Sequence, residues 1–164
     1  MQIIFLTPWE MVISFFIVWP LIQLIVTLIC NLFDVKKFNP NSFFLRCHKW
    51  ENGGKVYKTI FKIHKWKHLL PDGARVEKNG FEKKYLKTYD KEYIREFIYQ
   101  TGRAEISHWL QIIPFWVFGF WCPFYIIWLM LLYALLVNIP CILAQRYNRP
   151  RLIRVYDIKR FNLS

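Results

Sequence analysis

Two long stretches without Asp, Glu, Lys or Arg place the strongest constraint on how this chain can fold. They cover residues 11–33 and 106–145. A helix needs roughly 20 apolar residues to cross the hydrocarbon core of a bilayer, so the first stretch predicts one transmembrane helix. The second stretch is too long for one crossing and short for two. It therefore predicts a helical hairpin that either spans the bilayer or re-enters it.

Gly119 and Pro123 mark the expected tip of this hairpin, because glycine and proline interrupt helices. We expect the first arm at about residues 104–119 and the second at about residues 124–144. Pro114 lies inside the short first arm. The sequence alone therefore leaves both full and partial crossing open.

The distribution of charge predicts the orientation in the membrane. The chain carries 23 Lys and Arg against 11 Asp and Glu, a formal net charge of +12. Of the basic residues, 17 lie within residues 34–109 and the other six follow Gln145. Because basic loops stay on the cytoplasmic side, both basic segments should be cytoplasmic. The N-terminus carries Glu10 but no Lys or Arg, so it should lie outside.

These patterns predict an all-α, multi-pass protein of the cell membrane, with one integral membrane domain over residues 1–164. We expect a transmembrane helix at 11–33, a cytoplasmic interfacial segment at 34–103, a hairpin at 104–145 and a basic cytoplasmic tail at 146–164. The first stretch lacks the positive flank and the small-residue cleavage site of a signal peptide, so it should be a retained anchor.

The interfacial segment contains two amphipathic patterns. In residues 55–66, lysines recur three and four residues apart opposite an apolar face, which predicts a helix. Such a helix suits the surface of an anionic leaflet, although a lysine face over a small protein core would read the same way. A second helix is expected at residues 90–101 with Asp90 as its N-cap, and residues 74–87 should form a loop.

Glu105 and His108 are three residues apart at the entrance to the second apolar stretch, so they share a helical face. Ionisable residues at membrane depth suggest function. Glu105 could orient a neutral His108 ring, whose second nitrogen could then take a proton from a hydroxyl. Alternatively, Glu105 pairs with Arg103 or with the basic tail, and lipid headgroups satisfy His108 beside Trp109.

Three arginines, Arg146, Arg149 and Arg151, follow the second apolar stretch within six residues. They could simply anchor the helix end on the cytoplasmic side. That explanation does not account for the neighbouring Asn148 or for the Asn138-Ile139-Pro140 break. Arginine also binds phosphate through its forked donors, so the phosphate of a lipid or of a coenzyme A donor is the functional interpretation.

Two other classes of site are not expected. His64 and His68 have the spacing of helical metal ligands, but Lys65 and Lys67 beside them oppose a cation, so we predict no metal. Membrane topology explains the basic charge, and no nucleic-acid motif accompanies it. The four cysteines are isolated in sequence and are expected to be apolar fillers.

Four short islands of sequence carry a further signal. They are Trp50-Glu51-x-x-Gly54-Lys55, Trp66-Lys67-His68-x-x-x-Asp72-Gly73, Arg103-Ala104-Glu105-x-x-His108-Trp109 and Gln145-Arg146-Tyr147-Asn148-Arg149-Pro150-Arg151-Leu152. In this order they resemble the glycosyl-4,4'-diaponeurosporenoate acyltransferase family of Gram-positive bacteria. The similar region covers about residues 50–152, and its arginine-rich island is the most specific of the four.

The resemblance implies the last step of a staphyloxanthin-like pathway, in which a fatty acyl group is transferred to a sugar hydroxyl of a glycosylated C30 carotenoid acid. It implies an acyl-CoA or acyl carrier donor, an amphiphilic glycosylated acceptor and the bilayer as partners, with no cofactor and no nucleic acid. The alternative is a non-enzymatic membrane scaffold or complex subunit that binds anionic lipids through its lysine face. The matched positions become candidate site residues, namely His108 and Glu105 for catalysis and Arg103, Trp66, Lys67, Asp72, Arg146, Asn148 and Arg149 for substrate binding.

Overall fold

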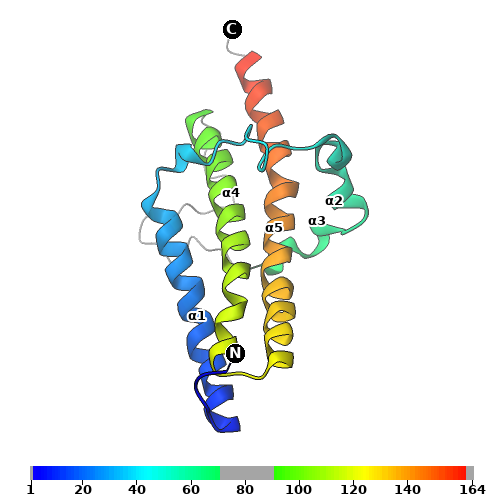
Figure 1. Cartoon of the computed structure of the whole chain (residues 1–164). Coiled ribbons are helices and arrows are strands. Elements are labelled where there is room, and N and C mark those ends of the chain that lie inside the picture. Colours follow the sequence, from blue (N-terminus) through cyan, green and yellow to red (C-terminus); the bar gives the residue numbers. More distant parts are fainter. Residues whose placement is uncertain (1, 71–90, 162–164) are drawn as a thin grey trace. The chain divides into compact units, whose positions relative to one another are not determined.

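The computed structural model describes residues 2–70 and 91–161, and every regular element in these ranges is helical (Figure 1). This confirms the predicted fold class. Two helical segments, Pro8–Leu32 and Phe124–Asp157, are long and apolar enough to cross a membrane. Asp72, the cap at Asp90 and the loop expected at 74–87 lie outside the described residues.

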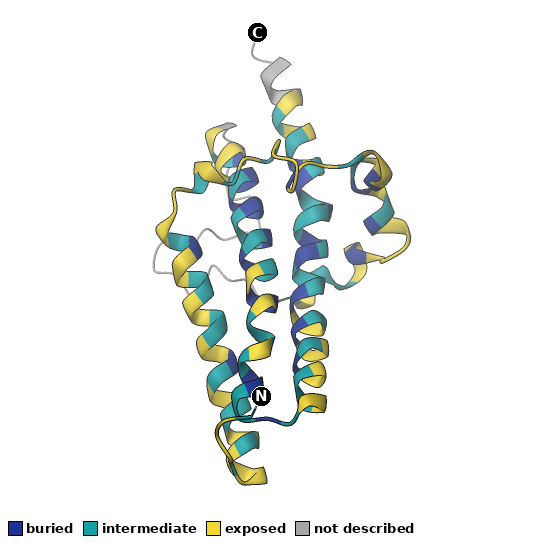
Figure 2. Cartoon of the chain, viewed as in Figure 1, coloured by how far each residue is buried: buried dark blue, intermediate teal, exposed yellow. Residues whose placement is uncertain are grey.

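Helix α1 (Pro8–Leu32) forms the predicted N-terminal span. It begins with a capping box, in which the Thr7 amide donates to the Glu10 carboxylate over 2.8 Å. Many apolar residues along the helix are exposed, and Figure 2 colours such positions yellow. Phe16, for example, is 78% exposed. Such a surface is costly in water and favourable in lipid.

The chain divides into two compact units, and the first consists of residues 1–33 and 106–139. It contains α1, the end of α4 (Lys91–Ile112), η5 (Ile113–Phe120) and the first part of α5 (Phe124–Phe161). The buried Phe118 ring lies 5.7 Å from the ring of Phe15 and 5.5 Å from that of Trp19. The Gln111 amide donates to Thr27 over 3.0 Å, so aromatic contacts join α1 to η5 and a polar contact joins α1 to α4.

The hairpin tip lies where it was predicted, between η5 and α5, but both arms differ from the expected ranges. The helix expected at 90–101 and the first arm are one helix, α4, which ends at Ile112. Pro114 follows at the start of the 3₁₀ segment η5, because proline fits a first helical turn but not a helix interior. The second arm continues to Phe161, so residues 146–161 of the basic tail are helical.

The second unit consists of residues 34–105 and 140–164. Its short elements are η1 (Val35–Lys37), η2 (Lys49–Gly54), α2 (Lys55–Thr59), α3 (Ile63–Trp66) and η3 (Lys67–Leu69). One apolar cluster joins Tyr57 and Ile63 to Tyr147 of α5. A second cluster joins α4 to α5 through Ile94, Phe97, Ile98 and Leu152. These two clusters form the core of the unit.

The prediction of a single helix over residues 55–66 is wrong. The helix is interrupted between α2 and α3, where Lys62 has a left-handed backbone conformation with φ of 49°. This turn allows Ile63 to be buried with Tyr57, while Ile60 and Phe61 stay exposed. The apolar face is therefore divided between a protein core and the surface, and the four lysines are exposed.

Gly54 allows η2 to approach α5 closely. It has a φ of 86°, and a Cβ there would lie 3.3 Å from the carbonyl oxygen of Tyr147. Only glycine adopts this backbone without strain and leaves that space open. The preceding Glu51 is thereby positioned against α5.

Candidate functional site

Three buried charged residues and the half-buried Arg146 form a continuous network in the second unit. Glu51 comes from η2, Glu105 from α4, and Arg146 and Arg149 from α5. The Glu105 carboxylate accepts one hydrogen bond from Arg146 Nε at 2.7 Å and another from Arg149 Nη2 at 2.6 Å. Both oxygens of Glu105 are thus engaged by arginines, which agrees with the predicted pairing of Glu105 with the tail.

Arg149 is almost completely buried, with 2% of its surface exposed. Besides Glu105, it donates from Nη1 to the Leu45 carbonyl at 2.6 Å and from Nε and Nη2 to the Thr101 hydroxyl and carbonyl, each at 3.0 Å. A guanidinium has five N–H donors, and four hydrogen bonds to protein acceptors use most of them. Arg149 therefore ties α4, α5 and the loop before η2 together.

Arg146 connects the same carboxylate to Glu51. Its Nη1 donates to Glu51 Oε1 over 2.6 Å, and its Nη2 donates to the Phe44 carbonyl over 2.7 Å. Glu51 also accepts from the Tyr57 hydroxyl at 2.8 Å. Burial alone would raise the pKa of Glu51, but hydrogen bonds from Tyr57, Arg146 and Cys47 together lower it below its ordinary value. Glu51 is thus held as a carboxylate.

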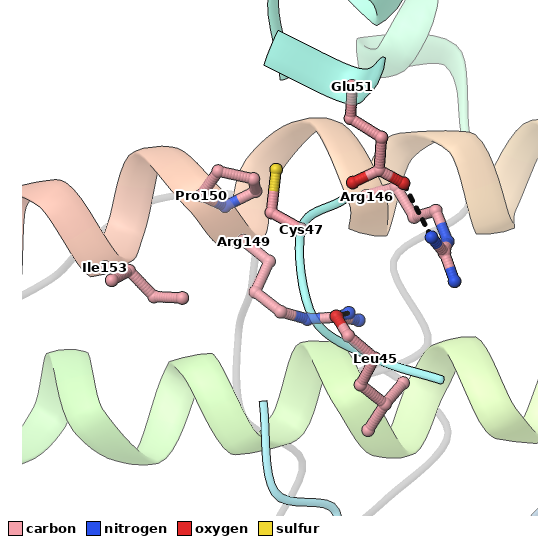
Figure 3. A pocket seen from close by; sticks show the side chains of 7 residues that line it. All are labelled: Leu45, Cys47, Glu51, Arg146, Arg149, Pro150 and Ile153. Atoms are coloured by element: carbon pink, nitrogen blue, oxygen red, sulfur yellow. Dashed lines mark hydrogen bonds and ion pairs between the residues drawn. The ribbon is translucent and has the colours of Figure 1, made fainter. Parts of the chain in front are cut away.

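A small cavity lies beside this network, and Figure 3 shows Cys47, Glu51 and Arg146 among its lining side chains. Its volume is about 10 Å³, room for at most one water molecule. Burial and the neighbouring Glu51 raise the pKa of the Cys47 thiol. This cavity is too small for an acyl chain or a sugar.

A second polar cluster surrounds the ring of Tyr147 on α5. Lys67 Nζ donates to Asn148 Oδ1 over 3.1 Å and lies 5.3 Å from the ring centroid. The Arg151 guanidinium lies 4.8 Å from the same centroid and donates to the Tyr147 hydroxyl. Burial and the charge of Arg151 lower the pKa of Lys67. Two cations thus lie close together, and the ion pairs among the described residues involve Arg146 and Arg149 rather than Lys67 or Arg151.

His108 lies on α4 in the first unit, and its ring is held from α5. Its Nδ1 lies 2.9 Å from the side-chain oxygen of Asn138. Asn138 is fully buried, and its amide nitrogen donates to the Ala134 carbonyl over 2.9 Å. Glu105 was predicted to orient His108. In the structure Glu105 bonds to Arg146 and Arg149, whereas His108 bonds to Asn138.

The remaining candidates contribute less to these clusters. Trp66 ends α3, donates to the Phe61 carbonyl over 2.8 Å and packs against the cluster around Tyr57. Arg103 is half-buried on α4. Asp72 lies outside the described residues.

Glu51, Asn138, Tyr147 and Arg151 belong to these clusters but were absent from the predicted site. Glu51 stands in the island Trp50-Glu51, and Asn138 stands in the Asn-Ile-Pro break of the second arm. Asn138 is a polar residue between the apolar Val137 and Ile139, and Glu51 directly follows Trp50. That is the local signal by which both could have been found, because buried polar groups need partners.

Comparison with known proteins adds a functional class to this geometry. The family model described as glycosyl-4,4'-diaponeurosporenoate acyltransferase matches residues 40–158. A protein of that name from Staphylococcus haemolyticus (strain JCSC1435) is 34% identical over 141 residues, which cover 86% of this chain and 82% of the relative. Its counterpart from Staphylococcus aureus (strain bovine RF122 / ET3-1) is 31% identical over 140 residues, covering 85% and 84%. No solved structure matches the chain.

The matched range includes both described clusters of the second unit as well as His108 and Asn138. Identity above 30% extends over most of both chains. The chain is therefore an acyltransferase and belongs to the glycosyl-4,4'-diaponeurosporenoate acyltransferase family.

Proposed function

We propose that this protein transfers a fatty acyl group from an acyl thioester to a sugar hydroxyl of a glycosylated carotenoid acid, in staphyloxanthin-like biosynthesis. The observation that carries the proposal is similarity, over about 85% of the chain, to relatives named glycosyl-4,4'-diaponeurosporenoate acyltransferase. The two membrane-length helices support it as well, because a polyene acceptor resides in the bilayer. No cofactor is needed, since the thioester supplies the activated acyl group.

We assign the role of general base to His108. Its ring takes the proton of the acceptor hydroxyl while that oxygen bonds to the carbonyl carbon of the thioester. The carbon–sulfur bond then breaks, and the leaving thiolate receives the proton back from the ring, so atoms and charges balance. A positioned base of this kind typically accelerates such a step by about 10²–10⁴-fold.

We place the phosphate groups of the donor at the cluster formed by Lys67, Asn148 and Arg151. Arg146 and Arg149 were expected to bind phosphate, and that role stays a prediction. Their guanidinium groups already donate hydrogen bonds within the protein, so we place the phosphate at the other cluster. Lys67 and Arg151, in contrast, repel one another across Tyr147. A phosphate between them would relieve this repulsion and accept charge-assisted hydrogen bonds.

The donor site is tested by measuring the KM for acyl-CoA. We expect Lys67→Gln and Arg151→Gln each to raise it about tenfold or more, because a lost hydrogen bond to a charged group costs ~1.5–3 kcal/mol. Lys65→Gln, which changes an exposed lysine of α3, is the matched control and should change the KM less than about twofold. An equal response of all three variants would show that only the net charge of the surface matters.

Glu51, Glu105, Arg146 and Arg149 form the frame that positions these groups. Their side chains join η2, α4 and α5, and Arg151 lies on α5, where Lys67 bonds to Asn148. Glu105 is therefore proposed to be a positioning residue rather than the base. Both of its oxygens already accept hydrogen bonds from arginines.

The proposed activity is tested with membranes of a host that makes no carotenoid. Membranes containing the protein should transfer a labelled acyl group from acyl-CoA, or from an acyl carrier, to a glycosylated C30 carotenoid acid. Membranes with an empty vector are the control. Transfer to a simple glycolipid but not to the carotenoid would change the acceptor. No transfer to any hydroxyl acceptor, with the protein well folded, would favour the lipid-binding scaffold.

A further inference from the structure

The ring of His108 is bonded at one nitrogen to a side chain whose own orientation is fixed. Asn138 Nδ2 donates to the carbonyl oxygen of Ala134, four residues earlier on α5. A carbonyl oxygen can only accept, so the amide nitrogen of Asn138 must face it. The amide oxygen of Asn138 is then directed to the other side, where it lies 2.9 Å from His108 Nδ1.

This chain of bonds determines the tautomer of the neutral imidazole. Asn138 Oδ1 can only accept a hydrogen bond, so His108 Nδ1 must carry the proton. A neutral ring has one N–H and one lone pair, and the lone pair is therefore at Nε2. A histidine side chain in water favours the opposite tautomer. The buried amide thus selects the form in which Nε2 can accept a proton.

We infer that Asn138 is a positioning residue that sets the tautomer and ring orientation of His108 for acyl transfer. The inference rests on the proposed function for its catalytic consequence, while the tautomer follows from the contacts alone. Asn138 thus takes the role of orienting the His108 ring, which the sequence had suggested for Glu105. Full burial of Asn138 supports this, because a buried amide is costly unless its donor and acceptor are both used.

An amide also suits the charged form that arises during transfer. When Nε2 takes the hydroxyl proton, the ring becomes an imidazolium with an N–H at both nitrogens. Asn138 Oδ1 continues to accept from Nδ1, so the ring keeps its orientation through both proton transfers. The neutral amide achieves this without placing a negative charge inside the apolar part of the first unit.

The tautomer can be measured without any enzymatic assay. The ring nitrogens of ¹⁵N-histidine-labelled protein in lipid nanodiscs are compared by solid-state NMR near pH 8, and the His108 signals are identified by their loss in His108→Gln. We expect Nδ1–H for His108 in the wild type and in Asn138→Asp, which keeps an acceptor at that position. Asn138→Leu should shift the ring towards Nε2–H. Gln111→Leu, which removes another buried amide of the first unit, should leave the tautomer unchanged.

Kinetics provide the second readout. Asn138→Leu should lower kcat at least about tenfold and at most by the roughly 10²–10⁴-fold that the base supplies, with KM values nearly unchanged. Asn138→Asp should retain more activity than Asn138→Leu. A wild-type ring with Nε2–H, or an Asn138→Leu protein with unchanged kcat, would overturn the inference. Absence of acyl transfer in the wild type, with Nδ1–H still observed, would instead refute the proposed function.

Discussion

Replacing Glu105 with glutamine distinguishes a positioning role from a catalytic one. The substitution removes a carboxylate that bonds to both Arg146 and Arg149, at 2.7 and 2.6 Å. A glutamine keeps one acceptor oxygen but presents an NH₂ donor to the second guanidinium. Breaking a buried ion pair by changing one partner costs about 3–5 kcal/mol. For a chain of this size that corresponds to a fall in Tm of about 6–20 °C.

The assay is thermal unfolding of the detergent-solubilised protein, followed by circular dichroism. Glu96→Gln is the matched control, because Glu96 lies exposed on the same helix, and its Tm should change by less than about 2 °C. The double variant Glu105→Leu with Arg149→Met should recover part of the loss, since it removes both members of a buried pair. A Glu105→Gln protein that has the same Tm as the wild type yet transfers no acyl group would refute the positioning role and make Glu105 a catalytic residue.

Three further predictions concern the pH dependence of stability, a glycine near α5 and the membrane topology. The pKa of Glu51 is lowered in the folded protein, so its ionised carboxylate should stabilise the fold at neutral pH and lose this effect on acidification. The difference in Tm between the wild type and Glu51→Gln should therefore shrink below about pH 4. Gly54→Ala should destabilise by about 1–3 kcal/mol in chemical denaturation, and by more than Gly53→Ala, whose Cβ would meet only a flexible side-chain end. Reporters inserted near Asn79 and after Ser164 should both respond to the cytoplasm, and one at the N-terminus to the outside; opposite sides for the first two would contradict the hairpin.

The helical class and the two long apolar segments could be predicted because they depend on local sequence. A run such as residues 11–33 has few stable alternatives to a transmembrane helix. The hairpin tip was predictable for the same reason, since Gly119 and Pro123 act on their own neighbours. The ends of helices were harder to predict. Helix α4 is continuous, although the sequence predicted a helix at 90–101 and a separate hairpin arm from 104.

The contacts of the site depend on residues far apart in sequence. Arg146 and Arg149 reach Glu105 across 41 and 44 residues, and Asn138 reaches His108 across 30. The spacing of Glu105 and His108 drew attention to two polar residues, but it could not reveal these partners.

The broken helix at Lys62 has a similar cause. Burial of Ile63 against the distant Tyr147 overrides the local lysine periodicity of residues 55–66. Sequence periodicity describes which side chains share a face, but not which of them a distant element will cover.

The central claim, that acyl transfer depends on His108 as the base, is tested most directly by one comparison. Membranes containing equal amounts of wild-type and His108→Gln protein are supplied with labelled acyl-CoA and the glycosylated carotenoid acid, and ester formation is measured at saturating concentrations of both. Glutamine can form hydrogen bonds but cannot take a proton, so we predict a fall in kcat of about 10²–10⁴-fold. Wild-type turnover by a folded His108→Gln protein would contradict the account.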